Sequence, residues 1–320
     1  MKKSRNKAFV IFLVAYVVVA MVAVNGFTVQ PQIDRLRSEE GHVEGRFEIS
    51  PMEVIGSGLI GGFRAPVVDY YWMKMIKLEN DREYYDIPRV ADLITKLQPN
   101  FPEVWVFNAW NLAYNIAVEW KAREDRWYYI RQGIETMKRG LQKDPQSVEL
   151  EYYLGWLYFH KVSSDTGDPE YYWMMEQVKK EEGEEALLLA AKYFERAKDL
   201  GSHPVYSQQV LEMRELAADM QASRYLLIDK PRKEPGDEEK GFAALEKSVS
   251  LAEKLVQAYP DNEGFRNRIM GYCMEVLPVL MGQYPEEKSP ERAGVLTDAL
   301  ARFILVVQSY NPAFQYIDVE

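Results

Sequence analysis

The chain contains very little cysteine and histidine: one cysteine and three histidines among 320 residues. The single Cys273 excludes an internal disulfide and a cysteine-based metal cluster. His42, His160 and His203 are too scattered for the spacing of a zinc site. No serine, cysteine or histidine stands in a nucleophile motif, and no phosphate-binding loop is visible. We therefore predict no metal, no cofactor and no catalytic residue, and we expect a protein that is not an enzyme.

Basic residues are also in deficit. The chain has 39 lysines and arginines against 49 aspartates and glutamates, a formal net charge of −10. The short N-terminal flank contains four of the basic residues, Lys2, Lys3, Arg5 and Lys7. The chain after this flank is therefore more acidic than the average. A body of this charge repels nucleic acid and anionic lipid surfaces. We therefore expect no nucleic-acid partner.

One apolar run departs from this composition. Residues 8–24 read AFVIFLVAYVVVAMVAV, without a charge, directly after the basic N-terminal flank. As a helix this run rises about 25 Å, close to the shortest membrane span. A cleaved signal peptide is the alternative, but the run is longer than a usual signal core and no small-x-small cleavage site follows it. We assign 1–27 to a cytoplasmic flank and single-pass transmembrane anchor, with the bulk of the chain outside a bacterial cytoplasmic membrane.

The rest of the chain predicts an all-α fold. Residues 28–57 are polar, with a weak strand-like alternation at 43–50, and we interpret them as a linker. From residue 58 onward apolar residues recur at helical spacing, without a strand-helix-strand unit. The predicted helices cover 62–79, 86–97, 102–120, 126–142, 147–161, 170–181, 184–200, 204–222, 239–258, 262–282 and 290–309.

Several helix boundaries carry physical signals. Side chains that can cap a helix N-terminus stand at Asp86, Ser147, Asp261 and Ser289. Pro102 and Pro290 fit a first helical turn, where no amide donor is needed. Gly201 can end a helix in the left-handed conformation. Residues 230–240, KPRKEPGDEEK, are rich in charge and proline, so we expect an exposed loop there.

Two patterns indicate how the helices pair. L-G-x-x-Y at 154–158 and A-x-x-x-F at 190–194 resemble the two half-signatures of a tetratricopeptide repeat (TPR). Glycine and alanine let two helix backbones approach, and the aromatic side chains fill the space beside them. The resemblance implies a TPR-like, right-handed solenoid of about five helical hairpins over 58–320.

An insertion separates these half-signatures. They lie about a dozen residues apart in a regular repeat, and here they are much further apart. The extra residues, at about 162–185, are expected to contain a short helix. Residues 171–175 of this insertion are aromatic or apolar. One interpretation is a protruding apolar patch that contacts a partner or the lipid surface, and the other is a strip buried by a neighbouring helix.

A second resemblance covers about the first third of the chain. GGFRAPVVDYYW at 61–72 and LQPNFPEVWVFNAWNLAYNIAVEW at 97–120 resemble a group of membrane-anchored, TPR-like bacterial proteins. The resemblance implies fold and topology, and no particular activity.

The second of these stretches is unusual in its asparagines. On a helical wheel, tryptophans and small apolar residues fill one broad face, and Asn108, Asn111, Asn115 and Glu119 share a remaining arc of about 80°. One interpretation is an asparagine track that grips an extended peptide in a concave groove. The other is that these amides tie down neighbouring loops or helix ends. Our candidate partner-binding residues are Asn108, Asn115, Trp105 and Glu119.

Together these observations predict a membrane-anchored interaction scaffold or assembly factor. It would bind a segment of another membrane or envelope protein in its helical groove. A cell-envelope enzyme or glycan-binding module is the alternative, which two close carboxylates in a pocket or a carboxyl group with a strongly raised pKa would favour. A permanent structural subunit of a membrane complex is the third interpretation.

Overall fold

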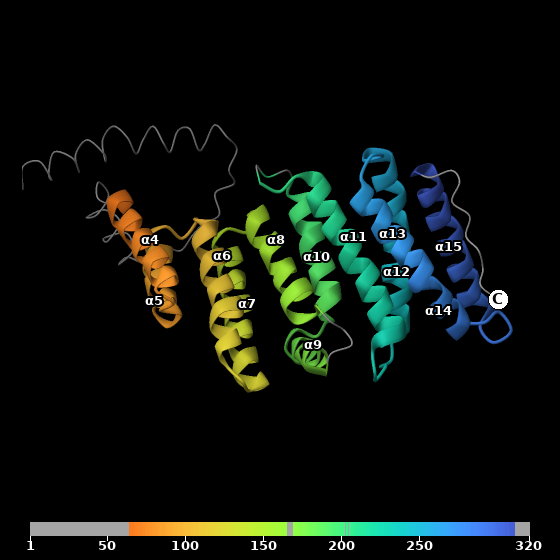
Figure 1. Ribbon diagram of the computed structural model, residues 1–320, viewed down its shortest axis with the longest axis horizontal. Coiled ribbons are helices and arrows are strands. Elements are labelled where there is room, and N and C mark those ends of the chain that lie inside the picture. The colour runs from red at the N-terminus through yellow and green to blue at the C-terminus, as the bar shows by residue number, and fades with distance from the viewer. Residues whose placement is uncertain (1–63, 165–168, 202, 204, 311–320) are drawn as a thin grey trace, which may run out of the picture. The chain divides into compact units, whose positions relative to one another are not determined.

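The computed structural model describes residues 64–164, 169–201, 203 and 205–310 (Figure 1). These residues form helices and contain no strand, which confirms the all-α prediction. The chain divides into two compact units, Met1–Asn111 and Leu112–Glu320, called unit 1 and unit 2 below. The predicted anchor at 1–27 and linker at 28–57 lie outside the described residues. Within the described part, no helix is both long and apolar enough to span a bilayer.

The described part of unit 1 is a short row of helices. It contains α4 (Arg64–Asn80), the 3-10 turn η2 (Tyr84–Asp86), α5 (Ile87–Leu97) and α6 (Pro102–Trp110). α4 packs on α5, and α5 packs on α6. α5 buries Ile87, Val90 and Ile94, because residues three and four apart share one helix face. Pro102 occupies the first turn of α6, as predicted.

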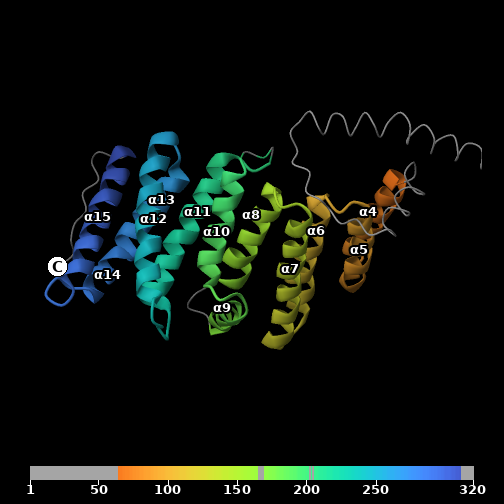
Figure 2. The same ribbon diagram turned by 180° about the vertical axis from the view of Figure 1, so that it is seen from behind.

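Unit 2 contains the longer row of helices. Its α-helices are α7 (Arg123–Lys143), α8 (Val148–Trp156), α9 (Pro169–Glu182), α10 (Ala186–Asp199), α11 (Gln208–Arg224), α12 (Asp237–Ala258), α13 (Glu263–Glu275), α14 (Leu277–Gln283) and α15 (Pro290–Tyr310). α8, α10, α11 and α12 pack on one another in this order, and α15 packs on α12 and α13. Both views show this succession (Figure 1, Figure 2).

Two of these helices end in a π-helical segment. η5 (Leu157–Val162) continues α8, and η6 (Tyr225–Asp229) continues α11. A third such segment, η3 (Asn111–Ile116), follows α6 and leads into the 3-10 turn η4 (Ala117–Glu119). Insertion of a π turn widens a helix and redirects the side chains beyond it. The same feature therefore recurs at the ends of three separate helices.

The packing of α8 against α10 follows the predicted pattern. Gly155 is buried, and a Cβ atom at this position would lie 3.1 Å from the ring of Phe194 and 3.3 Å from the carbonyl oxygen of Ala190. The side chains of Leu154 and Tyr158 are fully buried as well. Glycine here permits the close approach of the two helices. The expected role of the glycine and the aromatic ring in helix contact is therefore confirmed, while the repeat family stays a prediction.

Helix boundaries agree with the sequence patterns in most places, with some exceptions. Asp86 stands at the N-cap of α5, as predicted, but its side chain makes no cap hydrogen bond. Ser147 caps α8 by accepting a hydrogen bond of 3.2 Å from the Leu150 amide, but the corresponding cap of α13 is Asn262 and not Asp261. The helix predicted over 262–282 is two helices, α13 and α14. The break comes at Val276, because Pro278 in the next turn has no amide hydrogen to continue the helix.

Charged residues of the predicted loop at 230–240 are partly buried, contrary to expectation. Residues 231–236 are exposed, but Lys230 and Asp237 at its ends are each only 3% exposed. α12 begins at Asp237, so the loop is also shorter than predicted. The insertion contains the expected helix, α9, in which Met174 and Met175 are buried.

Candidate functional site: a basic and aromatic face on unit 2

A stripe of partly exposed side chains runs along the helix formed by α8 and η5. It consists of Glu149, Tyr153, Trp156 and His160, whereas Leu150, Leu154 and Leu157 between them are buried. Residues separated by three or four positions lie on the same side of a helix. α8 therefore presents polar and aromatic side chains on the side opposite its contact with α10.

The aromatic rings on this side are stacked on one another. The Trp156 and His160 rings lie 4.7 Å apart, centroid to centroid, with an angle of 9° between their planes. The Tyr114 hydroxyl and His160 Nδ1 share a hydrogen bond of 3.1 Å. This contact joins η3 to η5 within unit 2. Of the two stacked rings, His160 is exposed and offers ring surface against which an apolar or planar group can pack.

Cationic side chains surround these rings. The Arg214 guanidinium carbon, from α11, lies 4.4 Å from the centre of the Trp156 ring. The Lys161 ammonium nitrogen lies 4.9 Å from the centre of the Tyr114 ring. Both distances are typical of cation–π contacts. With Arg268 from α13, these residues form what we call the basic-aromatic face: Tyr114, Trp156, His160, Lys161, Arg214 and Arg268.

The cationic side chains of this face repel one another. Partial desolvation, and then the neighbouring Arg214 charge, hold the pKa of Arg268 below its usual value. Desolvation followed by the Lys161 and Arg214 charges likewise lowers the pKa of His160. Within the described residues, no carboxylate lies within 4.0 Å of a guanidinium nitrogen of Arg214 or Arg268. Arg214 and Arg268 therefore carry positive charge without a carboxylate in ion-pair contact in these parts of the chain, whereas the Glu170 charge opposes the lowering of the Lys161 pKa by desolvation.

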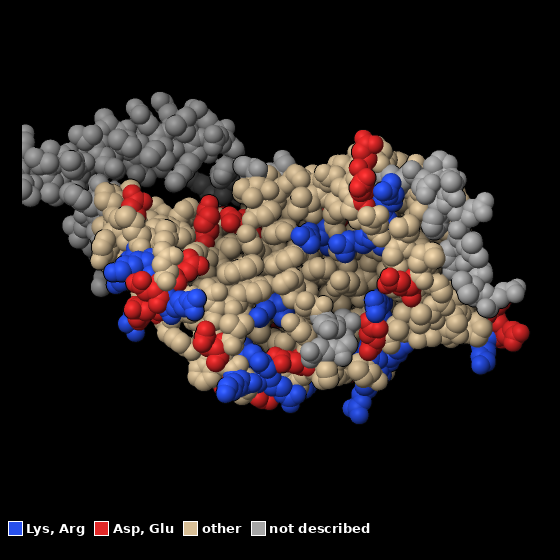
Figure 3. Space-filling model, viewed as in Figure 1, with Lys and Arg blue, Asp and Glu red and all other residues tan. Residues whose placement is uncertain are grey.

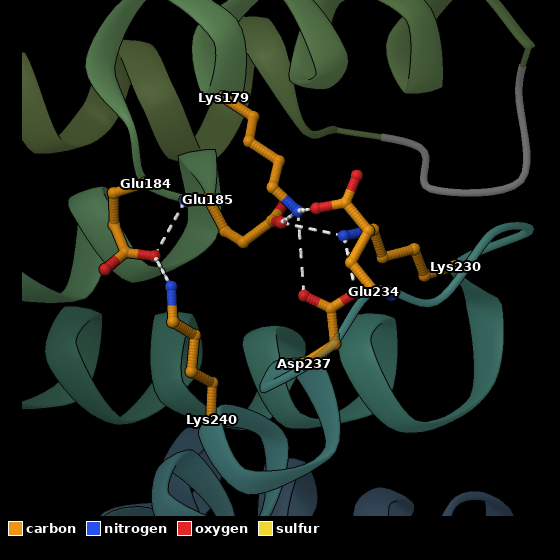
Figure 4. A network of polar contacts seen from close by, with 7 residues as sticks. All are labelled: Lys179, Glu184, Glu185, Lys230, Glu234, Asp237 and Lys240. Atoms are coloured by element: carbon orange, nitrogen blue, oxygen red, sulfur yellow. Dashed lines mark hydrogen bonds and ion pairs between the residues drawn. The ribbon is translucent and has the colours of Figure 1, made fainter.

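Other cations of unit 2 are paired much more fully. Lys230 Nζ lies 2.8 Å from Glu185 Oε1 and 2.8 Å from Asp237 Oδ2, and all three side chains are almost completely buried (Figure 4). Lys179, from α9, lies 2.7 Å from the same Glu185 oxygen. The cluster fastens the insertion helix to the loop before α12. Lys240 and Glu184 form a more exposed pair at its edge, 2.6 Å apart.

The same holds for α15 and α11. Arg302 contacts Glu246 at 2.7 Å and Glu253 at 2.6 Å. Lys247 lies 3.2 Å from Glu215 and 3.5 Å from Asp219. In a chain with more acidic than basic residues, most buried or clustered cations find a carboxylate partner. Arg214 and Arg268 have no such partner within 4.0 Å among the described residues.

Two buried carboxyl groups of unit 2 have strongly raised pKa values. Burial raises the pKa of Glu151 to about 7 and that of Asp219 to about 7, although Arg196 and Lys247 respectively oppose the shift. Their side chains are 0% and 3% exposed, and the Arg196 guanidinium lies 2.5 Å from Glu151. Each carboxyl group is enclosed by packed helices beside a cation. Burial among packed helices accounts for both upward shifts.

The distribution of charge over the surface agrees with this picture (Figure 3). On the side of unit 2 shown there, basic side chains lie in a row across the middle of the surface, between α8 and α13. Acidic side chains stand mostly toward its margins. A negatively charged segment would thus be attracted to the middle of the surface and repelled from its edges.

The four residues proposed from the sequence do not form one exposed site. Trp105 and Asn108 lie in unit 1, and both are buried, at 8% and 7% exposure. The Trp105 indole donates a hydrogen bond of 2.9 Å to the Pro99 carbonyl, which gives it a structural role. Asn115 and Glu119 lie in unit 2, where Asn115 is half-buried and Glu119 is exposed. Their part in partner binding stays a prediction.

Asn108 in α6 and Asn111 at its C-terminal cap differ in their side-chain hydrogen bonds. The Asn111 side chain donates a hydrogen bond of 3.1 Å to the carbonyl oxygen of Tyr84, so it ties η2 to the end of α6. This contact is of the kind that the structural interpretation of the asparagines predicts. The Asn108 Oδ1 atom is buried and has no hydrogen-bond donor among the described residues.

The basic-aromatic face was not predicted from the sequence. The stripe at positions 149, 153, 156 and 160 has helical spacing, and its residues are less apolar than those between them, so it was recognisable as a surface stripe. Nothing in the local pattern, however, places Arg214 beside Trp156, because the two residues belong to different predicted helices.

No family model, curated protein sequence or solved structure matches this chain.

Proposed function

We propose that this protein is a noncatalytic, membrane-anchored scaffold or assembly factor of the bacterial cell envelope that binds a segment of another protein on the basic-aromatic face of unit 2. The observation that carries the proposal is the position of Arg214 over Trp156, beside Arg268, without a carboxylate partner in the described part of the chain. Interfaces concentrate their binding energy in aromatic residues and arginines of this kind.

A TPR-like solenoid is the architecture that we propose for this function. The contact of Gly155 with Ala190 and Phe194 supports it, as does the succession of α8, α10, α11 and α12, in which each helix packs on the next. The π-helical segments at the ends of α6, α8 and α11 add a recurring structural feature. Stacked helix pairs of this type present one row of helices as a continuous binding surface.

Membrane attachment rests on the sequence alone. The apolar run at 8–24 follows a basic flank, which supports a single-pass anchor with the helical body outside the cytoplasmic membrane. An anchored scaffold meets its partners in two dimensions near the bilayer. We therefore propose that the partner is itself a membrane or envelope protein.

Site-specific photo-crosslinking in membranes tests the proposal. A photoreactive amino acid replaces Val210, which is exposed on α11 one turn before Arg214, or in a matched control replaces Tyr128, which is exposed on α7. We expect a discrete adduct from position 210 and a different or absent adduct from position 128. Trp156→Ala in the position-210 background should abolish the adduct without changing the circular dichroism spectrum.

Two outcomes would overturn the proposal. One is an adduct at position 210 that persists unchanged in Trp156→Ala. The other is the same set of adducts from positions 210 and 128, because this would show nonspecific contact and not a binding face.

A further inference from the structure

We infer that the segment bound on the basic-aromatic face is acidic, with carboxylates that pair with Arg214 and Arg268 and an aromatic or other apolar side chain that packs against the exposed His160 ring beside Trp156. This inference rests on the proposed function and specifies the chemistry of the partner. The proposed ligand is a segment of another protein, and the positive charge of the face indicates that this segment is acidic.

The first argument is the uncompensated charge. Arg214 and Arg268 bring two formal positive charges to α11 and α13, which pack on each other. After desolvation, the Arg214 charge also lowers the pKa of Arg268, so the two guanidinium groups repel each other. A carboxylate that pairs with both would replace this repulsion by two attractive contacts. Elsewhere in unit 2 the chain supplies that carboxylate itself, as at Lys230 and Arg302.

The second argument is the geometry of arginine. A guanidinium group offers planar, paired donors that match both oxygens of a carboxylate. Arg214 is held over the Trp156 ring, so its side chain is already restrained before a ligand binds. A restrained donor loses less conformational entropy on binding than a free surface lysine. The face is therefore suited to recognise individual carboxylates with defined positions.

The third argument separates an acidic protein segment from other polyanions. Nucleic acid binding depends on neutralising many regularly spaced phosphates over a wide basic surface. Here the basic row is narrow, acidic side chains stand toward the margins of the same surface, and the chain as a whole has a net charge of −10 (Figure 3). A long polyanion would meet this acidic surround, whereas a short acidic segment need contact only the basic row.

The stacked rings complete the proposed recognition. Trp156 is half-buried and His160 is exposed, with their planes nearly parallel. An aromatic side chain can pack against the exposed His160 ring and contributes beyond the area that it buries. We therefore expect acidic residues and at least one aromatic residue within a single short segment.

The test is selection from a random dodecapeptide library displayed on phage, with the full-length chain immobilised in detergent micelles. Peptides recovered on the wild-type chain should be enriched in aspartate and glutamate together with one aromatic residue. The strongest peptide is then labelled with fluorescein, and its Kd is measured by fluorescence anisotropy. Replacing its acids by the corresponding amides should raise the Kd at least about tenfold, as expected for the loss of charge-assisted hydrogen bonds.

Matched variants assign the effect to the two arginines. Arg214→Gln/Arg268→Gln should raise the Kd for the acidic peptide by about tenfold or more. Arg89→Gln/Lys74→Gln removes the same net charge from exposed positions of unit 1 and should change the Kd by less than about twofold. Charge reversal in Arg214→Glu/Arg268→Glu should transfer binding to a peptide in which lysines replace the acids.

The outcomes distinguish this inference from the proposed function. If selected peptides show no enrichment of acids, or if both double variants weaken binding equally, the inference is wrong. If heparin or single-stranded DNA displaces the acidic peptide at lower charge concentration than an acidic competitor peptide, the ligand is a different polyanion and the inference also fails. A membrane crosslink that needs Trp156 but survives Arg214→Gln/Arg268→Gln would leave the scaffold standing and remove the acidic partner.

Discussion

The buried ionic cluster makes a quantitative prediction about stability. Replacing Lys230 by methionine keeps a side chain of similar length but removes a charge that lies 2.8 Å from Glu185 and 2.8 Å from Asp237. Breaking a buried pair by removing one partner costs about 3–5 kcal/mol, because an uncompensated charge is left behind. Lys179 still contacts Glu185 at 2.7 Å and offsets part of this loss. We therefore expect Lys230→Met to lower the free energy of unfolding by about 3 kcal/mol.

The matched control is Lys240→Met in the same cluster. Lys240 lies 2.6 Å from Glu184, but the two side chains are 42% and 36% exposed. Exposed ion pairs contribute up to about 1 kcal/mol, so the control should lose no more than that. The two variants remove the same charge and differ in the burial of the pair.

Urea denaturation of the full-length chain in detergent, followed by circular dichroism, measures the difference. In thermal unfolding, about 3 kcal/mol corresponds to a decrease in Tm of roughly 6–12 °C for a body of this size. Equal midpoints for Lys230→Met and Lys240→Met would refute the reasoning. Such a result would mean that the buried charges do not fasten α9 and α12 as the geometry indicates.

Two further predictions concern packing and pH. Gly241→Ala should destabilise the chain by about 1–3 kcal/mol, because its Cβ would lie 2.7 Å from the Leu227 side chain. Gly271→Ala has no atom within 4 Å of the new Cβ and should stabilise the chain by about 0.5–1 kcal/mol. Equal thermal midpoints for the two variants would contradict this prediction. Burial raises the pKa of Asp219 to about 7, so the folded state binds this proton more tightly than the unfolded chain, and its contribution to stability falls as the pH rises from about 4 through 7. Asp219→Asn should therefore flatten the pH dependence and unfold at higher urea than wild type at pH 8; an unchanged slope between pH 5 and pH 8 would show that Asp219 is ionised in the folded state.

Most helix boundaries were predictable because they are set by neighbouring residues in the chain. Pro102 and Ser147 start α6 and α8, and Gly201, with a φ of 105°, follows the end of α10 in the left-handed conformation. These signals need no knowledge of tertiary contacts, since they act through the backbone within one turn. The break at Val276 was equally local, but the prediction did not weigh Pro278 inside an apolar run.

The burial of charge was not predictable in this way. The composition of 230–240 predicts a solvated loop, yet Lys230 is buried because Glu185, far away in the chain, meets it there. Composition reports the average preference of a segment for water, whereas one buried ion pair depends on a partner from another element.

For the candidate site too, some features follow from the local sequence and others depend on how the helices pack. The sequence by itself determined that the described part of the chain is helical and that Gly155 would allow close contact between helices. The expectation that 102–120 would be covered nearly all round holds only in part, because Trp110, Val118 and Trp120 are 38%, 59% and 36% exposed. Only the tertiary structure decided that the Arg214 guanidinium lies over the Trp156 ring and that Arg268 comes close enough for the Arg214 charge to lower its pKa. These residues stand on α8, α11 and α13, and their distances depend on how those helices pack. Periodicity specifies which side of a helix is apolar, but the neighbours of its polar side are set by packing between helices.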